Sequence, residues 1–65
     1  MTDEQMCEHF EKRPNDPLVI RGGDYIYGGW LVSTFRKRHK GVWRCVVEDM
    51  NGRLFIHNAS QLSTE

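Results

Sequence analysis

Alternating apolar and polar positions mark two neighbouring strand-like segments in the second half of the chain. Residues 43–47 are rich in β-branched and aromatic side chains, and residues 54–56 form a shorter apolar run. Asn51 and Gly52 lie between the two runs, and both residue types tolerate the positive φ that a tight hairpin turn requires. The pattern therefore predicts a β-hairpin over residues 42–57.

The same alternation assigns a face to each side chain of this hairpin, because neighbouring residues of a strand point to opposite sides. One face of the first strand carries alternate residues, namely Trp43, Cys45 and Val47. In the second strand, Leu54 and Ile56 share a face, and we expect these two aliphatic side chains to be the core pair. Phe55 and His57 are then expected on the outer face, where an exposed aromatic ring suggests a contact surface.

Shorter apolar runs with turn residues between them indicate further strands along the chain. They predict an edge strand at 18–21 after Pro17, an extended segment at 25–27 and a second main strand at 30–35. A bend or bulge is expected at Gly28-Gly29, and a polar loop at 36–41. A helical turn at 59–62 is expected to place Leu62 on the core. Closure into a barrel protects the edges that a small open sheet would expose. The sequence thus predicts an all-β, SH3-like barrel of four to five strands over residues 17–65.

Residues 1–16 form an acidic leader with two alternative structures. Thr2 and Gln5 have the spacing of a helix capping box, and Met6 and Phe10 follow at helical spacing. These signals favour a short helix over residues 3–12. A helix this short is marginal by itself, so a disordered leader is the alternative.

The length of 65 residues limits the core, because a domain of this size buries only about 60% of its unfolded surface. Cys7 and Cys45 are the only cysteines and are expected to be free thiols rather than a disulfide framework. Oligomerisation is the remaining way to supplement a small core. We therefore expect a homo-oligomer, either a dimer or a tetramer.

The charge balance and the hydropathy pattern narrow the location and the partners. The formal net charge is zero, which argues against a protein devoted to coating nucleic acid. No apolar run reaches the roughly 18–20 residues that span a bilayer, and the N-terminus lacks the pattern of a signal peptide. We expect a cytoplasmic protein without a membrane partner.

A local basic segment leaves nucleic-acid binding open as an alternative. Its positive side chains, with Trp43 nearby for base stacking, are Arg36, Lys37, Arg38, Lys40 and Arg44. A solvated hairpin tip explains the same residues without a ligand. The histidines and cysteines match no zinc spacing, and no serine or cysteine lies in a nucleophile motif. The sequence therefore predicts neither a metal site nor a catalytic residue.

The aromatic residues expected near the end of the barrel are the most informative surface. Phe55 and His57 are predicted on the outer face, with Tyr25, Tyr27 or Trp30 nearby. Such a patch suits self-association, an external protein partner or a small molecule. Self-association is the use that a domain with a small core needs most.

Four short motifs carry a resemblance to known proteins over residues 19–62. They are Gly23-Asp24-Tyr25, Val46-Val47-Glu48-Asp49, Gly52-Arg53-Leu54-Phe55-Ile56 and Gln61-Leu62. In these motifs the chain resembles short uncharacterised bacterial and phage-borne proteins. More distantly, it is similar to the plasmid-borne, trimethoprim-insensitive type II dihydrofolate reductases, which are SH3-like barrels that form a tetramer around a central pore.

The reductase resemblance implies a set of ligand-holding positions. The pore motif Val-Gln-Ile-Tyr of that family falls on Leu54-Phe55-Ile56-His57, its pore-mouth lysine near Arg21, and its interface tryptophan near Tyr27. It implies NADPH as cofactor and dihydrofolate as substrate. Phe55 lacks the hydrogen-bonding amide of the family's glutamine, and His57 replaces a tyrosine. We therefore expect a self-associating binding module without a cofactor, and NADPH-dependent reduction of dihydrofolate is the enzymatic alternative.

Overall fold

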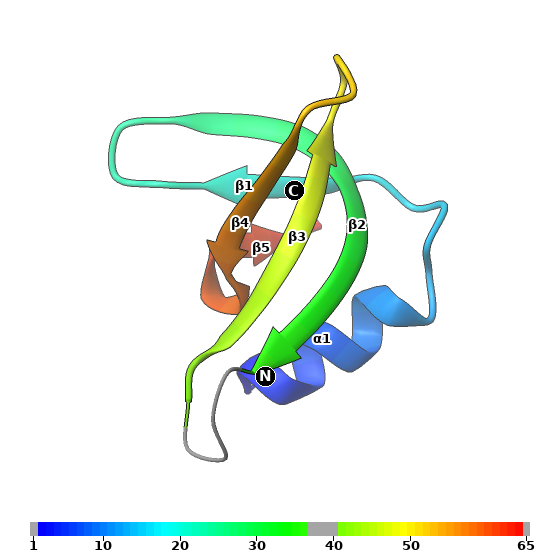
Figure 1. Cartoon of the computed structure of the whole chain (residues 1–65), viewed down its shortest axis with the longest axis vertical. Helices are drawn as coiled ribbons and strands as arrows, with labels where there is room; N and C mark the ends of the chain where they lie inside the picture. The colour runs from blue at the N-terminus through cyan, green and yellow to red at the C-terminus, as the bar shows by residue number, and fades with distance from the viewer. Residues whose placement is uncertain (1, 37–40, 65) are drawn as a thin grey trace.

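The computed structural model describes residues 2–36 and 41–64 (Figure 1). They form one helix, α1 (Asp3–Glu11), and one antiparallel sheet with the strand order β4-β3-β2-β1-β5. The elements after the helix are β1 (Leu18–Arg21), β2 (Ile26–Arg36), β3 (Trp43–Asp49), β4 (Leu54–Asn58), the 3₁₀ turn η1 (Ala59–Gln61) and β5 (Leu62–Ser63). The fold is the small, barrel-like all-β fold that the sequence predicts.

The long strand β2 closes the fold because it belongs to both halves of the sheet. Its residues 26–29 pair with β1, and its residues 29–36 pair with β3 (Figure 1). At Gly29 a Cβ atom would lie 2.3 Å from the carbonyl oxygen of Glu48, so this crossing requires glycine. The strand is continuous through Gly28-Gly29, and its bulge is at Val32, between Leu31 and Ser33. The bulge predicted at the glycines is therefore wrong in position, whereas the alternative, a bend, agrees with the change of partner strand from β1 to β3 at Gly29.

Two other elements refine the predicted strand list. Residues 18–21 were expected to be an edge strand, but β1 pairs with β2 on one side and with β5 on the other. The reason is that the 3₁₀ turn η1 returns the chain beside β1, and β5 extends from it. The predicted turn at 59–62 and the burial of Leu62, which is 3% exposed, are confirmed.

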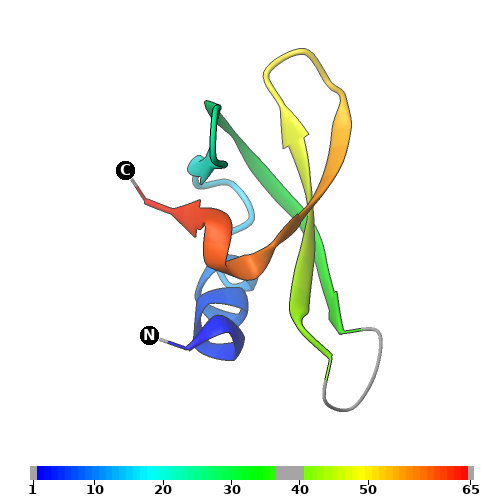
Figure 2. The same ribbon diagram turned by 90° about the vertical axis from the view of Figure 1, so that its left-hand side faces the viewer.

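The N-terminal segment is a helix that packs on the sheet. The Thr2 hydroxyl accepts from the backbone N–H of Gln5, and the Gln5 side chain accepts from the backbone N–H of Thr2, so the predicted capping box is present. Cys7 and Phe10 are buried on the inner side of α1. Figure 2 shows α1 on the same side of the β2–β3–β4 sheet as η1 and β5. Of the two alternatives for this leader, the helix is the one observed.

The core lies between α1, the inner face of the sheet and the C-terminal strand. Its buried residues are Phe10, Leu18, Ile20, Cys45, Val47 and Leu62, with Met6, Tyr27 and Leu31 packed against them. Both cysteines are free thiols. Burial raises the pKa of Cys45 to about 11 and also raises that of Cys7, which keeps both thiols protonated and unreactive at neutral pH.

The β3–β4 turn is one residue longer than a tight turn centred on Asn51 and Gly52. The backbone N–H of Asp49 donates to the Arg53 carbonyl at 2.9 Å, so three residues separate this closing pair. Gly52 alone has positive φ, at 81°. The Asp49 carboxylate accepts from the backbone N–H groups of Asn51 and Arg53, each at 2.9 Å. These bonds fix the longer loop.

The longer turn reverses the predicted faces of β4, because a shift of one residue moves every side chain to the opposite side. Val47, on the buried face, pairs with Phe55, and Val46, on the other face, pairs with Ile56. Leu54 and Ile56 are 60% and 56% exposed. The expectation that they form the core pair is wrong, and so is the expectation that Phe55 and His57 point outward. The prediction for the β3 face is correct, since Cys45 and Val47 are fully buried.

Candidate functional site

Four aromatic side chains gather at the open end of the barrel and form what we call the aromatic cluster. It consists of Tyr25, Tyr27, Phe55 and His57, and its five close ring pairs have centroids 5.7–6.3 Å apart. Tyr25 directly precedes β2, Tyr27 is its second residue, and the other two rings lie on the inner face of β4. The barrel thus joins segments that are about thirty residues apart in the sequence.

A chain of hydrogen bonds fixes the orientation of the cluster. Tyr25 Oη lies 3.2 Å from His57 Nδ1, and Tyr27 Oη is bonded to His57 Nε2. Gln61 donates from Nε2 to Tyr25 Oη at 2.9 Å and to the carbonyl of Arg21 at 3.0 Å. A neutral imidazole satisfies this chain when Tyr25 donates to Nδ1 and Nε2–H donates to Tyr27. The two tyrosine rings and the imidazole are therefore held in place by contacts within the chain.

The protonation of His57 follows from its position. Burial lowers the pKa of His57 below its ordinary value, and the side chain of Gln61 opposes this shift to a smaller extent. Burial likewise raises the pKa of Tyr27. At neutral pH the cluster is thus uncharged, because both the imidazole and the phenol keep their neutral forms.

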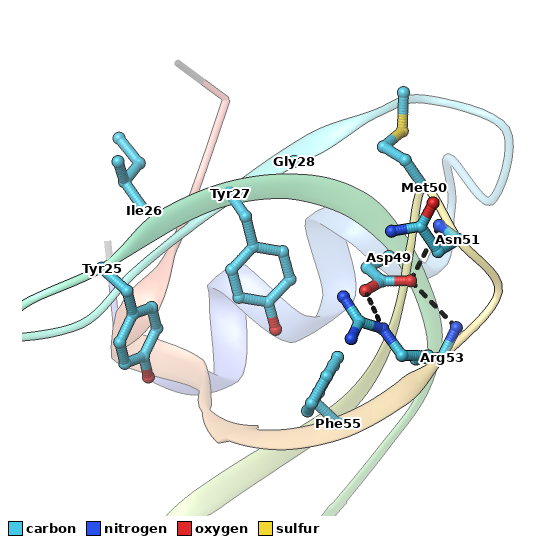
Figure 3. A pocket seen from close by; sticks show the side chains of 9 residues that line it. All are labelled: Tyr25, Ile26, Tyr27, Gly28, Asp49, Met50, Asn51, Arg53 and Phe55. Carbon is cyan, nitrogen blue, oxygen red and sulfur yellow. Dashed lines mark hydrogen bonds and ion pairs between the residues drawn. The ribbon is translucent and has the colours of Figure 1, made fainter.

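Two adjoining hollows expose the cluster to solvent. One, of about 260 Å³, is lined by the four aromatic residues alone. The other, of about 350 Å³, shares three of these rings and extends along the β3–β4 turn (Figure 3); it is lined by Tyr25, Ile26, Tyr27, Gly28, Asp49, Met50, Asn51, Arg53 and Phe55. We call the two hollows together the aromatic cleft. It is an elongated apolar surface with a polar end at the turn.

The polar end is formed by an ion pair. Arg53 Nε donates to Asp49 Oδ2 at 2.9 Å, and the guanidinium carbon of Arg53 lies 5.7 Å from the centroid of the Phe55 ring. The backbone N–H of Arg53, with smaller contributions from the N–H of Asn51 and the Arg53 guanidinium, lowers the pKa of Asp49. The carboxylate is therefore ionised, and the guanidinium of Arg53 balances its negative charge. Because a guanidinium has five N–H donors, Arg53 keeps donors for an acceptor group in the cleft.

The structure divides the predicted ligand or interface residues into three places. Tyr27, Phe55 and His57 come together in the aromatic cluster. Leu54 and Ile56 lie on the opposite face of β4, away from the cleft. Arg21 is exposed at the end of β1, where its carbonyl accepts from Gln61.

The predicted nucleic-acid residues are described in part. Lys37, Arg38 and Lys40 lie outside the described residues. Arg36 stacks over Trp43, with 5.0 Å between its guanidinium carbon and the ring centroid. Arg44 is the next residue of β3 after Trp43 and so points to the other face of the sheet.

Three residues of the site were absent from the sequence prediction: Asp49, Arg53 and Gln61. The signal for Gln61 was its place in the Gln61-Leu62 motif at the end of the resemblance, but its side chain reaches the site only because η1 returns it to β1. The signal for Asp49 was an aspartate two residues before Asn51-Gly52, since aspartate accepts from the backbone N–H two residues on in a turn. These residues hold the aromatic rings and the turn that carries them.

Among the described residues, no three histidine, cysteine or acidic side chains are grouped to hold a metal ion. Over residues 2–36 and 41–64, no helix has both the length and the apolar character needed to cross a membrane. Comparisons with family models, with curated proteins and with solved structures gave no match.

Proposed function

We propose that this protein is a binding module whose aromatic cleft holds the ligand. The observation that supports this most strongly is that three of the rings are fixed by hydrogen bonds and the fourth, Phe55, by ring contacts, and yet the cluster remains accessible. Tyr25 and Phe55 are 43% and 39% exposed, although larger aromatic groups gain most from burial. Rings that are held in place without being buried provide a contact surface. A ligand that binds there does not have to order these side chains, because their conformational entropy is already lost on folding.

The charges around the cleft favour one class of ligand. The Asp49 carboxylate is paired with Arg53, and the Arg53 guanidinium lies over the Phe55 ring. A cationic ligand would therefore meet a like charge at this ring and no free carboxylate. A neutral or anionic ligand with a planar group fits better, because the planar group stacks on Tyr27 or Phe55 while an acceptor group reaches Arg53.

A titration with three small probes tests this proposal. We would add adenosine monophosphate, tetramethylammonium and a proline-rich decapeptide to the ¹⁵N-labelled protein and follow its backbone amide resonances by NMR. We expect adenosine monophosphate to shift the amides of Tyr27, Arg53 and Phe55 at millimolar concentration. Tetramethylammonium should shift them least. No shift at these positions with any probe would contradict the proposal.

Two neighbouring substitutions on β4 separate the cleft from the rest of the strand. Phe55→Ala removes a ring of the cleft. We expect it to weaken probe binding by about tenfold, because one aromatic contact contributes about 1–2 kcal/mol to the binding free energy. Leu54→Ala is the matched control, because Leu54 precedes Phe55 and points to the other face. Equal losses in the two variants would show that the probe does not use the cleft.

Self-association remains part of the proposed function, and its surface is considered below. NADPH-dependent reduction of dihydrofolate and nucleic-acid binding through the basic loop 36–40 stay predictions. Oxidation of NADPH by the purified protein with dihydrofolate would establish the first. Binding of an oligonucleotide that weakens steeply with salt would support the second.

A further inference from the structure

The free edge of β4 presents backbone groups that have no strand to pair with. In the part of the chain that the structure describes, β4 is the first strand of the sheet and pairs only with β3. The Arg53 carbonyl accepts from β3, and the side to which the backbone groups point alternates along an antiparallel strand. The N–H and C=O groups of Phe55 and His57 therefore face β3. Those of Leu54 and Ile56 face outward.

This edge lacks the features that keep sheet edges apart. Natural edge strands are protected by lysine, proline, bulges or inward-pointing charges. The β4 sequence Leu-Phe-Ile-His-Asn contains none of these, and its pairing with β3 is regular. Its two apolar side chains on the outer face, Leu54 and Ile56, are more than half exposed. The edge is thus suited to another strand with apolar side chains.

The outer face of the sheet extends this apolar surface. Ile56 pairs with the half-buried Val46, and Val32 lies across from Val46 at the β2 bulge. The exposed apolar side chains of this face are Val32, Phe35, Leu54 and Ile56, which are 37–60% exposed. At about 150–200 Å² per side chain, they expose on the order of 400 Å². Leu54 and Ile56, which lie on the edge strand, account for about half of this area, whereas Val32 and Phe35 lie on β2, two strands away from the edge.

We propose that a second copy of this chain docks on the edge, with the two β4 strands antiparallel about a two-fold axis at Phe55. In this register the N–H and C=O groups of Leu54 exchange hydrogen bonds with those of the partner's Ile56, and the symmetric pair does the same. All four outward groups at Leu54 and Ile56 are then used. The Leu54 and Ile56 side chains of the two copies meet on the outer face.

Neighbouring registers fit less well. A shift that pairs Leu54 with its own copy places Ile56 opposite Gly52, whose N–H already donates to the Asp49 carbonyl. A shift that pairs Ile56 with its own copy places Leu54 opposite Asn58, whose N–H donates to Gln61. The charge of the chain also allows pairing, because a net charge of zero produces no long-range repulsion between copies.

Ile56→Lys tests the proposal, and Val32→Lys serves as the matched control. Both residues are exposed to a similar extent on the outer face, 56% and 55%, but Val32 lies on β2, away from the edge. Sedimentation equilibrium between 1 and 500 µM should show a dimer for the wild type. Ile56→Lys should weaken the dimer by about 100-fold or more, because a charge would replace a buried aliphatic contact. A monomeric wild type, or stronger disruption by Val32→Lys than by Ile56→Lys, would overturn the proposal.

Amide hydrogen exchange of the wild-type protein tests the same register without a substitution. The Leu54 and Ile56 amides should exchange more slowly at 500 µM than at 1 µM, because they are bonded only in the dimer. The Phe55 and His57 amides should be protected at both concentrations. Protection of Leu54 and Ile56 that does not change with concentration would contradict the edge pairing.

Discussion

The two faces of β4 use the same backbone in opposite ways. On the inner face, the rings of Phe55 and His57 contact Tyr27 of β2, and both ring nitrogens of His57 are hydrogen-bonded to tyrosine hydroxyls. On the outer face, Leu54 and Ile56 lie opposite Glu48 and Val46 of β3 and remain more than half exposed. The difference places the proposed ligand cleft on one face of β4 and the apolar surface of the proposed dimer contact on the other. It also shows that a four-residue motif is not one site, because its alternate members lie on opposite faces.

The turn that sets these faces gives the largest expected effect. Asp49→Ala removes the acceptor for two backbone N–H groups and for the Arg53 guanidinium. The three-residue loop then loses the bonds that fix its length, so we expect the largest drop in melting temperature of the variants considered. Thermal unfolding followed by circular dichroism measures it. Asp49→Asn keeps one acceptor oxygen and should lose less, and equal stability of Asp49→Ala and wild type would contradict this role.

The contribution of Asp49 to the free energy of unfolding should disappear in acid. The pKa of Asp49 is lower in the folded chain than in the unfolded chain, so its stabilisation is present above the ordinary value of about 3.9. It is lost as the pH falls through the lower, folded value. The stability difference between wild type and Asp49→Asn should therefore shrink below about pH 4. A constant difference down to pH 2 would be inconsistent with the ion pair.

The next largest effect compares the two faces directly. Phe55→Ala should lower the free energy of unfolding by about 1–2 kcal/mol, because the ring is partly buried against Tyr27. Leu54→Ala should cost about 0.5 kcal/mol or less in the monomer, as is usual for exposed positions. Urea unfolding of dilute samples measures both. A larger loss for Leu54→Ala would mean that the faces are assigned the wrong way round.

The hydroxyls of the aromatic cluster have a smaller effect. Tyr27→Phe removes one hydrogen bond to His57 and should cost about 1 kcal/mol, the usual net value for such a bond. Tyr25→Phe should cost less, because the Tyr25 side chain is more exposed and water replaces its partner. The two unfolding curves decide the order. If Tyr25→Phe cost more, the hydrogen-bond chain would depend on Gln61 and Tyr25 rather than on Tyr27.

The smallest effect is the pH dependence due to His57. Burial holds its pKa below the ordinary value of about 6.5, so the unfolded chain takes up a proton first as the pH falls. Stability from His57 is therefore present above about pH 6.5 and is lost as the pH falls towards the folded pKa. NMR titration of the His57 ring in the folded and urea-unfolded chain measures the shift. A higher pKa in the folded chain would reverse the sign.

The sequence specified the elements of the fold better than their register. Strands, capping box and the burial of Leu62 follow from local patterns, because each depends on residues within one or two turns. The faces of β4 depend on whether the loop after Asp49 has two or three residues, and Asn-Gly alone suits either. The Asp49 carboxylate decides between them through contacts that alternation does not encode.

The aromatic cluster was predicted in part for a related reason. Phe55 and His57 were expected to be close to Tyr25 or Tyr27. This expectation is correct although the faces of β4 are reversed, because the inner face of β4 lies against Tyr27 of β2. Gln61 was not expected there, since its contact with Tyr25 spans 36 residues of the sequence and requires η1 to fold back on β1. Long-range contacts of polar side chains leave no periodic signal.

Nuclear Overhauser effects across the β3–β4 hairpin test the central claim most directly, since they report which side chains share a face. The register predicts contacts between the Phe55 and Tyr27 rings, and contacts between Ile56 methyl groups and Val46. These should be present in dilute wild-type protein without any ligand. Contacts of the Ile56 methyl groups with Val47 and Tyr27 instead, with the Phe55 ring free of Tyr27, would contradict the account.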